Sequence, residues 1–94
     1  PAYRHMTVPA HVNITHDPDH ERTTLELTCK DRHGLLSHIS RILLAHHIHI
    51  SHAKIGTYGE KVEDTFHLTD SEHRPLTDPA TIAALQQDLI QALQ

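Results

Sequence analysis

Two stretches near the start of the chain alternate between apolar and polar residues. The first covers residues 11–16 and the second residues 24–29, and in each the apolar side chains fall on every second position. Such a period of two is typical of strands that bury one face. The polar, turn-rich residues 17–21 separate the two stretches. We therefore predict an antiparallel hairpin of two half-buried strands.

A helical period replaces this alternation after Gly34. Apolar residues recur three and four positions apart over residues 35–45, which predicts a helix that ends near residues 46–47. A second helix is predicted to follow Asp78, which is a good N-cap, and to begin at Pro79, which suits the first helical position. The residues expected to face the core are Leu35, Leu36, Ile39, Ile42 and Leu43 in the first helix, and Ile82, Leu85, Leu89, Ala92 and Leu93 in the second.

A third strand-like stretch, residues 48–57, changes the parity of its apolar positions part-way. The apolar residues before Ser51 share one face, whereas Ala53 and Ile55 share the other. A β-bulge inserts one extra residue into a strand and so reverses the facing of everything after it. A bulge near Ser51 and His52 would therefore restore a single buried face.

A hairpin is expected to join this strand to a fourth one. Residues 56–61 form the predicted loop, and residues 62–68 form the returning strand with Phe66 inward. Parity with Phe66 also turns the carboxyl group of Asp64 inward. A buried carboxyl group needs a hydrogen-bonding partner.

The predicted order of elements is strand, strand, helix, strand, strand, helix. One antiparallel four-stranded sheet with both helices on a single face is the α+β solution for such an order. Without the first strand, the order matches the start of a ferredoxin-like βαββαβ unit whose last strand is missing. That last strand would lie antiparallel beside the strand that precedes the first helix, so we expect residues 11–16 to occupy the same edge. An uncovered edge there would invite aggregation.

Length and composition are compatible with one domain. Ninety-four residues with 37% hydrophobic content support a single modest core. We interpret residues 1–9, which lack periodicity, as a linker and residues 10–94 as the domain. Because the chain starts with Pro1 instead of Met, we expect it to be a piece of a longer polypeptide.

Charge and cysteine content argue against several classes of partner. The net charge is −4 with neutral histidines, and the eight Lys and Arg are scattered, so a nucleic-acid surface is not expected. No apolar stretch has the length of a membrane span, and none resembles a signal peptide. The single cysteine, Cys29, lies in a predicted buried strand, which favours a reducing cytoplasm.

Twelve histidines are the most unusual part of the composition. A zinc or nickel site needs several ligands in a fixed geometry, and only the segment from His47 through His49 to His52 has a suitable local spacing. The other histidines are dispersed and no second motif completes a tetrahedral set, so we expect no metal site. These positions are interpreted instead as half-exposed surface, whose charge would change sharply as the pH falls through about 6.5.

The most informative motif is the corner Asp31-Arg32-His33-Gly34-Leu35-Leu36, which joins the second strand to the first helix. A strand that turns directly into a helix presents unpaired backbone N–H groups and the positive end of the helix dipole at one place, which suits a carboxylate ligand. Asp31 is the nearest acidic group for a ligand ammonium, and Gly34 leaves room for close approach. The bulge, or a neighbouring domain, is expected to face this corner. The candidate binding residues are Asp31, Arg32, His33, Gly34, Leu35, Leu36, Ser51, His52 and Ala53.

Simpler interpretations stay open for the same motifs. Asp31 could only cap the helix, Gly34 could only allow the helix to pack tightly on the strand, and the bulge could only curve the sheet. A catalytic triad of Asp64, His67 and Ser71 lacks any nucleophile motif, so no catalytic residue is expected.

The corner and a second segment, Ala53-Lys54-Ile55-Gly56-Thr57-Tyr58-Gly59-Glu60-Lys61-Val62-Glu63-Asp64-Thr65-Phe66, together resemble the ACT domain family. The resemblance covers about residues 23–93. More narrowly, the segment resembles the C-terminal ACT domain of bifunctional uridylyltransferase/uridylyl-removing enzymes, which modify the PII signal protein. His33 departs from that family, which usually has proline there, so a preset φ is lost and a titratable group stands beside the presumed ligand corner.

The resemblance implies a regulatory function. The parent enzyme would uridylylate PII when nitrogen is scarce and remove uridylyl groups when glutamine is abundant, with its ACT domains sensing glutamine. Its nucleotidyltransferase and metal-dependent hydrolase domains, which would need magnesium, would lie upstream of this sequence. This stretch is expected to have no catalytic activity and no cofactor of its own, and to pair with the parent's other ACT domain or with a second copy.

Three classes of function stay open at this point. The favoured one is a regulatory domain that binds an amino acid. The second is a dimerisation domain that keeps the fold but has lost the ligand, and the third is a small metal-binding or catalytic domain. An ACT domain of another regulated enzyme, such as an alarmone synthetase, is the competing assignment, and residues 59–64 argue against it.

Overall fold

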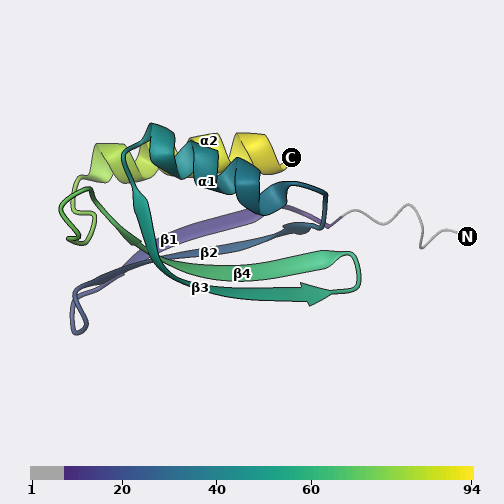
Figure 1. The fold of residues 1–94 in the computed structure, drawn as a ribbon, viewed down its shortest axis with the longest axis horizontal. Coiled ribbons are helices and arrows are strands. Elements are labelled where there is room, and N and C mark those ends of the chain that lie inside the picture. The colour runs from purple at the N-terminus through teal and green to yellow at the C-terminus, as the bar shows by residue number, and fades with distance from the viewer. Residues whose placement is uncertain (1–7) are drawn as a thin grey trace, which may run out of the picture.

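The computed structural model describes residues 8–94 and consists of one sheet and two helices (Figure 1). Its elements are β1 (His11–Asp17), β2 (Arg22–Lys30), α1 (Leu35–Ala45), β3 (His49–Tyr58), β4 (Lys61–Thr69) and α2 (Pro79–Leu93). Both helices lie on the same face of the sheet. The predicted α+β, ferredoxin-like arrangement is therefore confirmed.

All neighbouring strands are antiparallel, and their order in the sheet is β1-β2-β4-β3. β1 pairs with β2 so that Val12 lies opposite Leu27 and Ile14 lies opposite Leu25. β1 thus occupies the edge beside β2, where the last strand of a βαββαβ unit lies. The sequence predicted this use of the hairpin strand.

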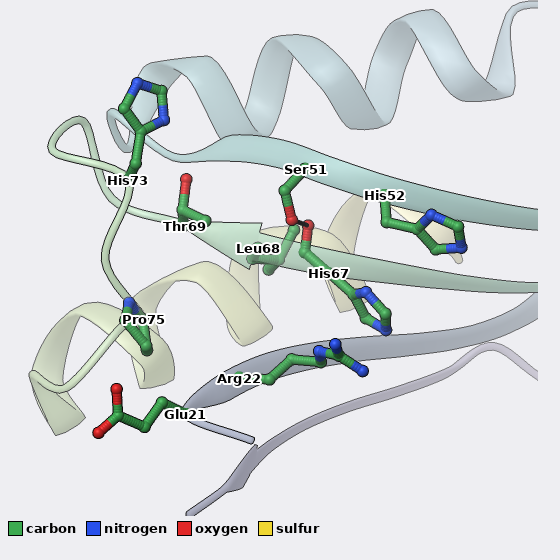
Figure 2. A pocket seen from close by; sticks show the side chains of 9 residues that line it. All are labelled: Glu21, Arg22, Ser51, His52, His67, Leu68, Thr69, His73 and Pro75. Atoms are coloured by element: carbon green, nitrogen blue, oxygen red, sulfur yellow. Dashed lines mark hydrogen bonds between the residues drawn. The ribbon is translucent and has the colours of Figure 1, made fainter.

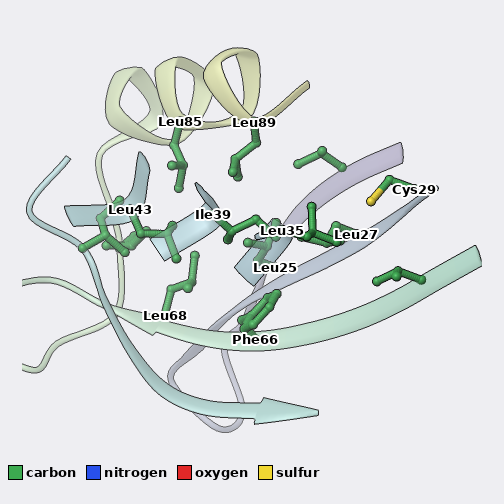
Figure 3. Close-up of a cluster of buried hydrophobic side chains, with 14 residues drawn as sticks. Leu25, Leu27, Cys29, Leu35, Ile39, Leu43, Phe66, Leu68, Leu85 and Leu89 are labelled. Carbon is green, nitrogen blue, oxygen red and sulfur yellow. The ribbon is translucent and has the colours of Figure 1, made fainter. Parts of the chain in front are cut away.

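A single core lies between the sheet and the helices (Figure 3). Alternate residues of β2 and β4 point into it, because successive side chains of a strand face opposite sides. They meet Ile39 and Leu43 of α1 and Leu85 and Leu89 of α2, none of which is more than 1% exposed. Full burial of such a side chain contributes roughly 1.5–3 kcal/mol, so these contacts hold the helices on the sheet.

The prediction that Leu36 belongs to the buried stripe of α1 is wrong. Leu36 is 44% exposed, whereas Leu35, Ile39 and Leu43 are buried. The buried residues follow one another at intervals of four, and Leu36 is rotated by about 100° from that row. The stripe of α1 is therefore narrower than predicted, and Leu36 stands at the open start of the helix.

The bulge predicted in β3 is present. The register with β4 shifts between Ile50 and His52, so Ser51 is the extra residue. After the shift, Ala53 and Ile55 lie opposite the buried Phe66 and Asp64 and share their side of the sheet.

The expected burial of that face of β3 is wrong. Every residue of the strand is exposed except Gly56, which is half-buried. β3 is an edge strand, and the helices pack over the middle of the sheet, so its helix side stays uncovered. The predicted loop is also too long, because β3 continues to Tyr58 and only Gly59 and Glu60 form the turn.

Both helices have defined ends. Asp78 caps α2 by accepting a hydrogen bond from the backbone N–H of Ala80 at 3.3 Å, as predicted. At the end of α1, the N–H groups of His47 and Ile48 donate to the carbonyls of Leu44 and Leu43, both at 2.9 Å. His47 has φ +60°, so it occupies the left-handed position that glycine usually fills in such a Schellman ending. After this ending, the chain passes through the buried Ile48 and enters β3 at His49.

A buried threonine fixes the connection that precedes α2. Thr23 is only 1% exposed, and its hydroxyl group accepts a hydrogen bond from the backbone N–H of Leu76 at 2.9 Å.

Neither helix is long and apolar enough to span a membrane in the part of the chain that the structure describes. Residues 1–7 of the predicted linker lie outside the described residues, and residues 8–10 lead into β1 without regular structure.

Candidate functional site

The corner between β2 and α1 is held by backbone contacts. The N–H of Asp31 donates to the carbonyl of Glu60 at 2.7 Å, which ties the corner to the β3-β4 turn. Gly34 is the N-cap residue of α1, with φ +76° and ψ +11°, and non-glycine residues adopt this left-handed conformation only with strain. Among residues 8–94, no side chain caps α1, so the alternative role of Asp31 as a helix cap is not observed.

The missing cap leaves donors available at the start of α1. The N–H of Leu35 bonds weakly to the carbonyl of Arg32 at 3.3 Å. Within residues 8–94, the N–H groups of Leu36 and Ser37 have no hydrogen-bonding partner. Unpaired N–H groups at a helix N-terminus, together with the helix dipole, favour an anion there by about 0.3–1 kcal/mol.

These donors stand beside a hollow of about 440 Å³, which we call the corner hollow. All six predicted corner residues line it. The remaining lining residues come from α1 and from the far ends of β3 and β4, and they are Ser37, Ile55, Thr57, Val62 and Asp64. The fold therefore brings the predicted corner together as one surface.

Asp64 is the buried acid of the corner hollow, and its residue is only 2% exposed. One carboxylate oxygen, Oδ1, accepts a hydrogen bond from the backbone N–H of Gly56 at 3.2 Å. The other, Oδ2, has no partner among the described residues. Burial raises the pKa of Asp64, the hydrogen bond from Gly56 opposes that rise, and the nearby charge of Asp31 adds to it.

Charged groups of both signs surround the mouth of the corner hollow. Asp31 and Arg32 are both exposed at the rim. The guanidinium of Arg32 donates to Nδ1 of His38 at 2.7 Å, which holds it over the first turns of α1. The hollow thus offers cationic and N–H groups on the helix side and carboxyl groups from Asp31 and Asp64.

The other predicted binding residues lie elsewhere. Ser51 and His52 line a second hollow of about 420 Å³, which we call the histidine hollow (Figure 2). Ala53 lines neither. The corner and the bulge are therefore not brought together within one chain, because β3 is an extended strand of ten residues and they lie near its opposite ends.

The histidine hollow is lined by side chains from three neighbouring strands and from the loop after β4. The rings of His52 and His67 stack with their centres 5.0 Å apart, and the hydroxyl of Ser51 donates to the carbonyl of His67 at 3.3 Å. Burial lowers the pKa of His67, and the charges of Arg22 and His52 lower it further. Figure 2 shows His73 on the loop, apart from the stacked pair.

The arrangement does not support the catalytic or metal alternatives. In the described part of the chain, no three His, Cys, Asp or Glu side chains are grouped so that they could hold a metal ion. Asp64 and His67 are three positions apart on β4 and so face opposite sides of the sheet. Cys29 is buried, and this burial raises the pKa of its thiol, which is typical of a structural cysteine.

Sequence reasoning missed the wall of the corner hollow that β3 and β4 supply. Ile55 and Asp64 are directly opposite each other in the register, as are Thr57 and Val62. The alternation of β4 already predicts that Asp64 faces inward. Pairing β3 with β4 residue by residue from the β3-β4 turn places Thr57 opposite Val62 and Ile55 opposite Asp64. The change of parity in β3 indicated instead the bulge, which lies near the opposite end of the strand.

Comparison with known proteins gives consistent matches. The model of the ACT domain family matches residues 23–88. The bifunctional uridylyltransferase/uridylyl-removing enzyme of Pseudomonas entomophila (strain L48) is 45% identical over 91 residues, and that of Ectopseudomonas mendocina (strain ymp) is 42% identical over 90 residues. These alignments cover 97% and 96% of this chain but only 10% of each enzyme. The chain thus spans about a tenth of the length of the curated relatives that it matches. No solved structure matches it.

Proposed function

Because this chain belongs to the ACT domain family, we propose that it binds a free amino acid, glutamine first, and regulates a longer enzyme. The proposed site is the corner hollow, with the ligand carboxylate at the N–H groups of Leu36 and Ser37. The predicted contacts of Ser51, His52 and Ala53 would require these residues to come from a neighbouring domain.

One observation carries this proposal: the corner hollow combines groups for an anion with groups for a cation. The uncapped start of α1 and the guanidinium of Arg32 suit a carboxylate. The carboxyl groups of Asp31 and Asp64 suit an ammonium. A free α-amino acid carries an ammonium group and a carboxylate group on the same carbon atom, so it matches the hollow better than a simple anion does.

The relatives suggest which enzyme is regulated. They are bifunctional uridylyltransferase/uridylyl-removing enzymes, and the chain aligns with them over almost its whole length. We propose that the parent protein is a cytoplasmic enzyme of this kind, which would add uridylyl groups to PII when nitrogen is scarce and remove them when glutamine is abundant. Magnesium would be needed only by its catalytic domains.

Calorimetric titration of the 94-residue chain with the common amino acids tests this proposal. Glutamine is expected to give a saturable heat, and glutamate, whose side chain adds a negative charge beside Asp31 and Asp64, is expected to bind more weakly. D-Glutamine is the control for non-specific binding. Equal heats for glutamine and its enantiomer would contradict a built site.

Pairing between ACT domains is a second proposed role, and the exposed edge strand favours it. Ile50, Ile55 and Tyr58 of β3 are 38%, 48% and 64% exposed, and no strand of the described chain covers their edge. We propose that a second copy, or another ACT domain of the parent, lies along β3. Sedimentation velocity is expected to show a dimer that Tyr58→Lys weakens, since a charge at the edge disfavours pairing. A monomer at every concentration would contradict pairing without affecting the binding proposal.

A further inference from the structure

The unpaired oxygen of Asp64 sets this carboxyl group apart from the other acidic residues of the described chain. Its residue is 98% buried, and Oδ2 is shielded from solvent without any hydrogen-bonding partner. Leaving a buried charged acceptor unsatisfied is unfavourable, and most buried polar groups in proteins are paired. Such an exception requires an explanation, and buried groups of this kind gather at functional sites.

A purely structural role does not account for both oxygens. The bond from Gly56 to Oδ1 joins β3 to β4 at one point of a ladder that already pairs Ile55 with Asp64. An asparagine would keep that bond through its carbonyl oxygen without the burial of a charge. The sheet therefore uses only one of the two carboxylate oxygens of Asp64.

Resting on the proposed function of the corner hollow, we infer that Oδ2 of Asp64 accepts a hydrogen bond from the ligand's α-ammonium group. Asp64, Leu36 and Ser37 line the same hollow, so a single ligand inside it has both the carboxyl group and the free N–H groups around it. Asp31, which the sequence favoured for this role, is exposed at the rim, where water weakens its attraction for a cation. Asp64 lies at the buried side of the hollow, where a charge-assisted hydrogen bond is stronger.

A ligand would reach the shielded Oδ2 only after side chains at the rim of the hollow move aside. Leu36 is 44% exposed, and Asp31 and His33 are exposed as well, so packing fixes none of these three. Arg32 is also exposed, although its guanidinium is bonded to His38. Rotation of an exposed side chain occurs within nanoseconds. The bound ammonium would then complete the hydrogen bonding of Asp64, and the ligand's apolar stem would lie against Leu36 and Ile55.

A comparison of two ligands isolates the ammonium contact. Glutaramate has the carboxylate and the amide of glutamine but no α-ammonium group. The 94-residue chain is expected to bind L-glutamine at least about tenfold more tightly than glutaramate. Asp64→Asn is expected to weaken glutamine binding by at least about tenfold and to leave glutaramate binding within about threefold, so that the preference disappears. The neighbouring Glu63→Gln is the matched control, because Glu63 is exposed on the opposite face of β4, where it pairs with Lys61 at 2.8 Å.

The possible outcomes separate the two proposals. If Asp64→Asn keeps the preference for glutamine over glutaramate, the role of Asp64 is refuted while the binding site stands. A loss of preference in Glu63→Gln of the same size would also refute it, since long-range charge would then explain the effect. If the unmodified chain binds neither ligand nor any other amino acid, the proposed function and this inference both fail. Thermal unfolding of each variant checks that it is folded.

Discussion

The corner hollow and the histidine hollow have nearly the same volume, about 440 and 420 Å³, but their hydrogen bonding differs. In the corner hollow, the start of α1 has no cap and Asp64 keeps an unpaired oxygen. In the histidine hollow, Ser51 donates to the backbone carbonyl of His67, the rings of His52 and His67 stack, and among the described residues no buried side-chain nitrogen or oxygen lacks a partner there. Volume alone therefore does not distinguish the two hollows.

Under the proposed function the corner hollow is the ligand site, and unmet hydrogen-bonding capacity, not size, is what sets it apart. A buried group without a partner raises the free energy of the folded chain, and a ligand that supplies the partner recovers that energy. Ring nitrogens of histidine that stay accessible to water have nothing comparable to gain. The four experiments below test this contrast.

The largest expected effect comes from Gly34→Val. No atom of the chain lies within 4 Å of a Cβ added at Gly34, so a side chain fits there. The φ of +76° strains a valine by about 1–2 kcal/mol. Because Gly34 lines the corner hollow, the valine side chain would occupy its mouth. We expect glutamine affinity measured by calorimetry to fall roughly a hundredfold, the loss of a contact worth about 3 kcal/mol. Gly59→Val is the matched control, because Gly59 also has a positive φ of +64° and open space around it but does not line the hollow. Similar losses of affinity in both variants would place the ligand elsewhere.

Asp64→Asn is expected to increase stability while it weakens binding. The folded pKa of Asp64 is raised by burial, so the folded chain holds this proton more tightly than the unfolded chain does, and ionisation destabilises the fold as the pH rises. At pH 7 the variant should be more stable by about 1 kcal/mol. The difference should shrink as the pH falls through the raised folded pKa of Asp64 and should be gone below 3.8, the ordinary value for aspartate, where both the folded and the unfolded chain are protonated. Urea unfolding at several pH values measures this. A variant that is less stable at pH 7 would indicate a structural role for the carboxylate.

His67→Gln should produce a smaller change with the opposite pH dependence. The folded pKa of His67 is lowered by burial and by the charges of Arg22 and His52, so folding favours the neutral ring. The stability that this provides is complete above about pH 6.5 and is lost as the pH falls through the lowered pKa. The unmodified chain should therefore lose more stability between pH 7 and pH 5 than the variant does in thermal unfolding. His16→Gln, which removes an exposed histidine from β1, is the comparison, and parallel curves for all three proteins would contradict the role of His67.

Ser51→Ala should have the smallest effect. It removes an exposed hydroxyl group that bonds to the carbonyl of His67, and such surface changes alter stability by less than about 0.5 kcal/mol. Because Ser51 lines the histidine hollow and not the corner hollow, glutamine affinity of the isolated chain should stay the same. A clear loss of affinity would mean that the bulge of one copy contacts the ligand of another.

The sequence predicted the elements of the fold well because each carried a local signal. Alternation marked β2 and β4, the change of parity located the bulge at Ser51, and Asp78 marked the start of α2. What it could not predict is that the helices leave β3 uncovered on their own side of the sheet. That depends on how two helices divide the width of a four-stranded sheet, which no local pattern of β3 reveals.

The candidate site was predictable only in part for a similar reason. The corner from Asp31 to Leu36 is contiguous in sequence, so its motif identifies it. The opposite wall depends on the pairing of Ile55 with Asp64, and the role of Asp64 depends on the absence of a second partner. An unmet hydrogen bond is a property of the assembled structure and leaves no trace in a single sequence.

The position of β1 at the edge beside β2 has a consequence for how fast the sheet can form. The two strands are joined by only four residues, 18–21, whereas a strand placed after α2 would have to close a loop from Lys30 past Leu93, more than 60 residues. The entropy of loop closure grows by about 0.6 kcal/mol with each doubling of length, so the local hairpin avoids roughly 2.5 kcal/mol of that barrier. Domains rich in local contacts fold faster than those with distant strand pairs. This chain should therefore complete the β1-β2 edge early in folding, before α2 has packed against it.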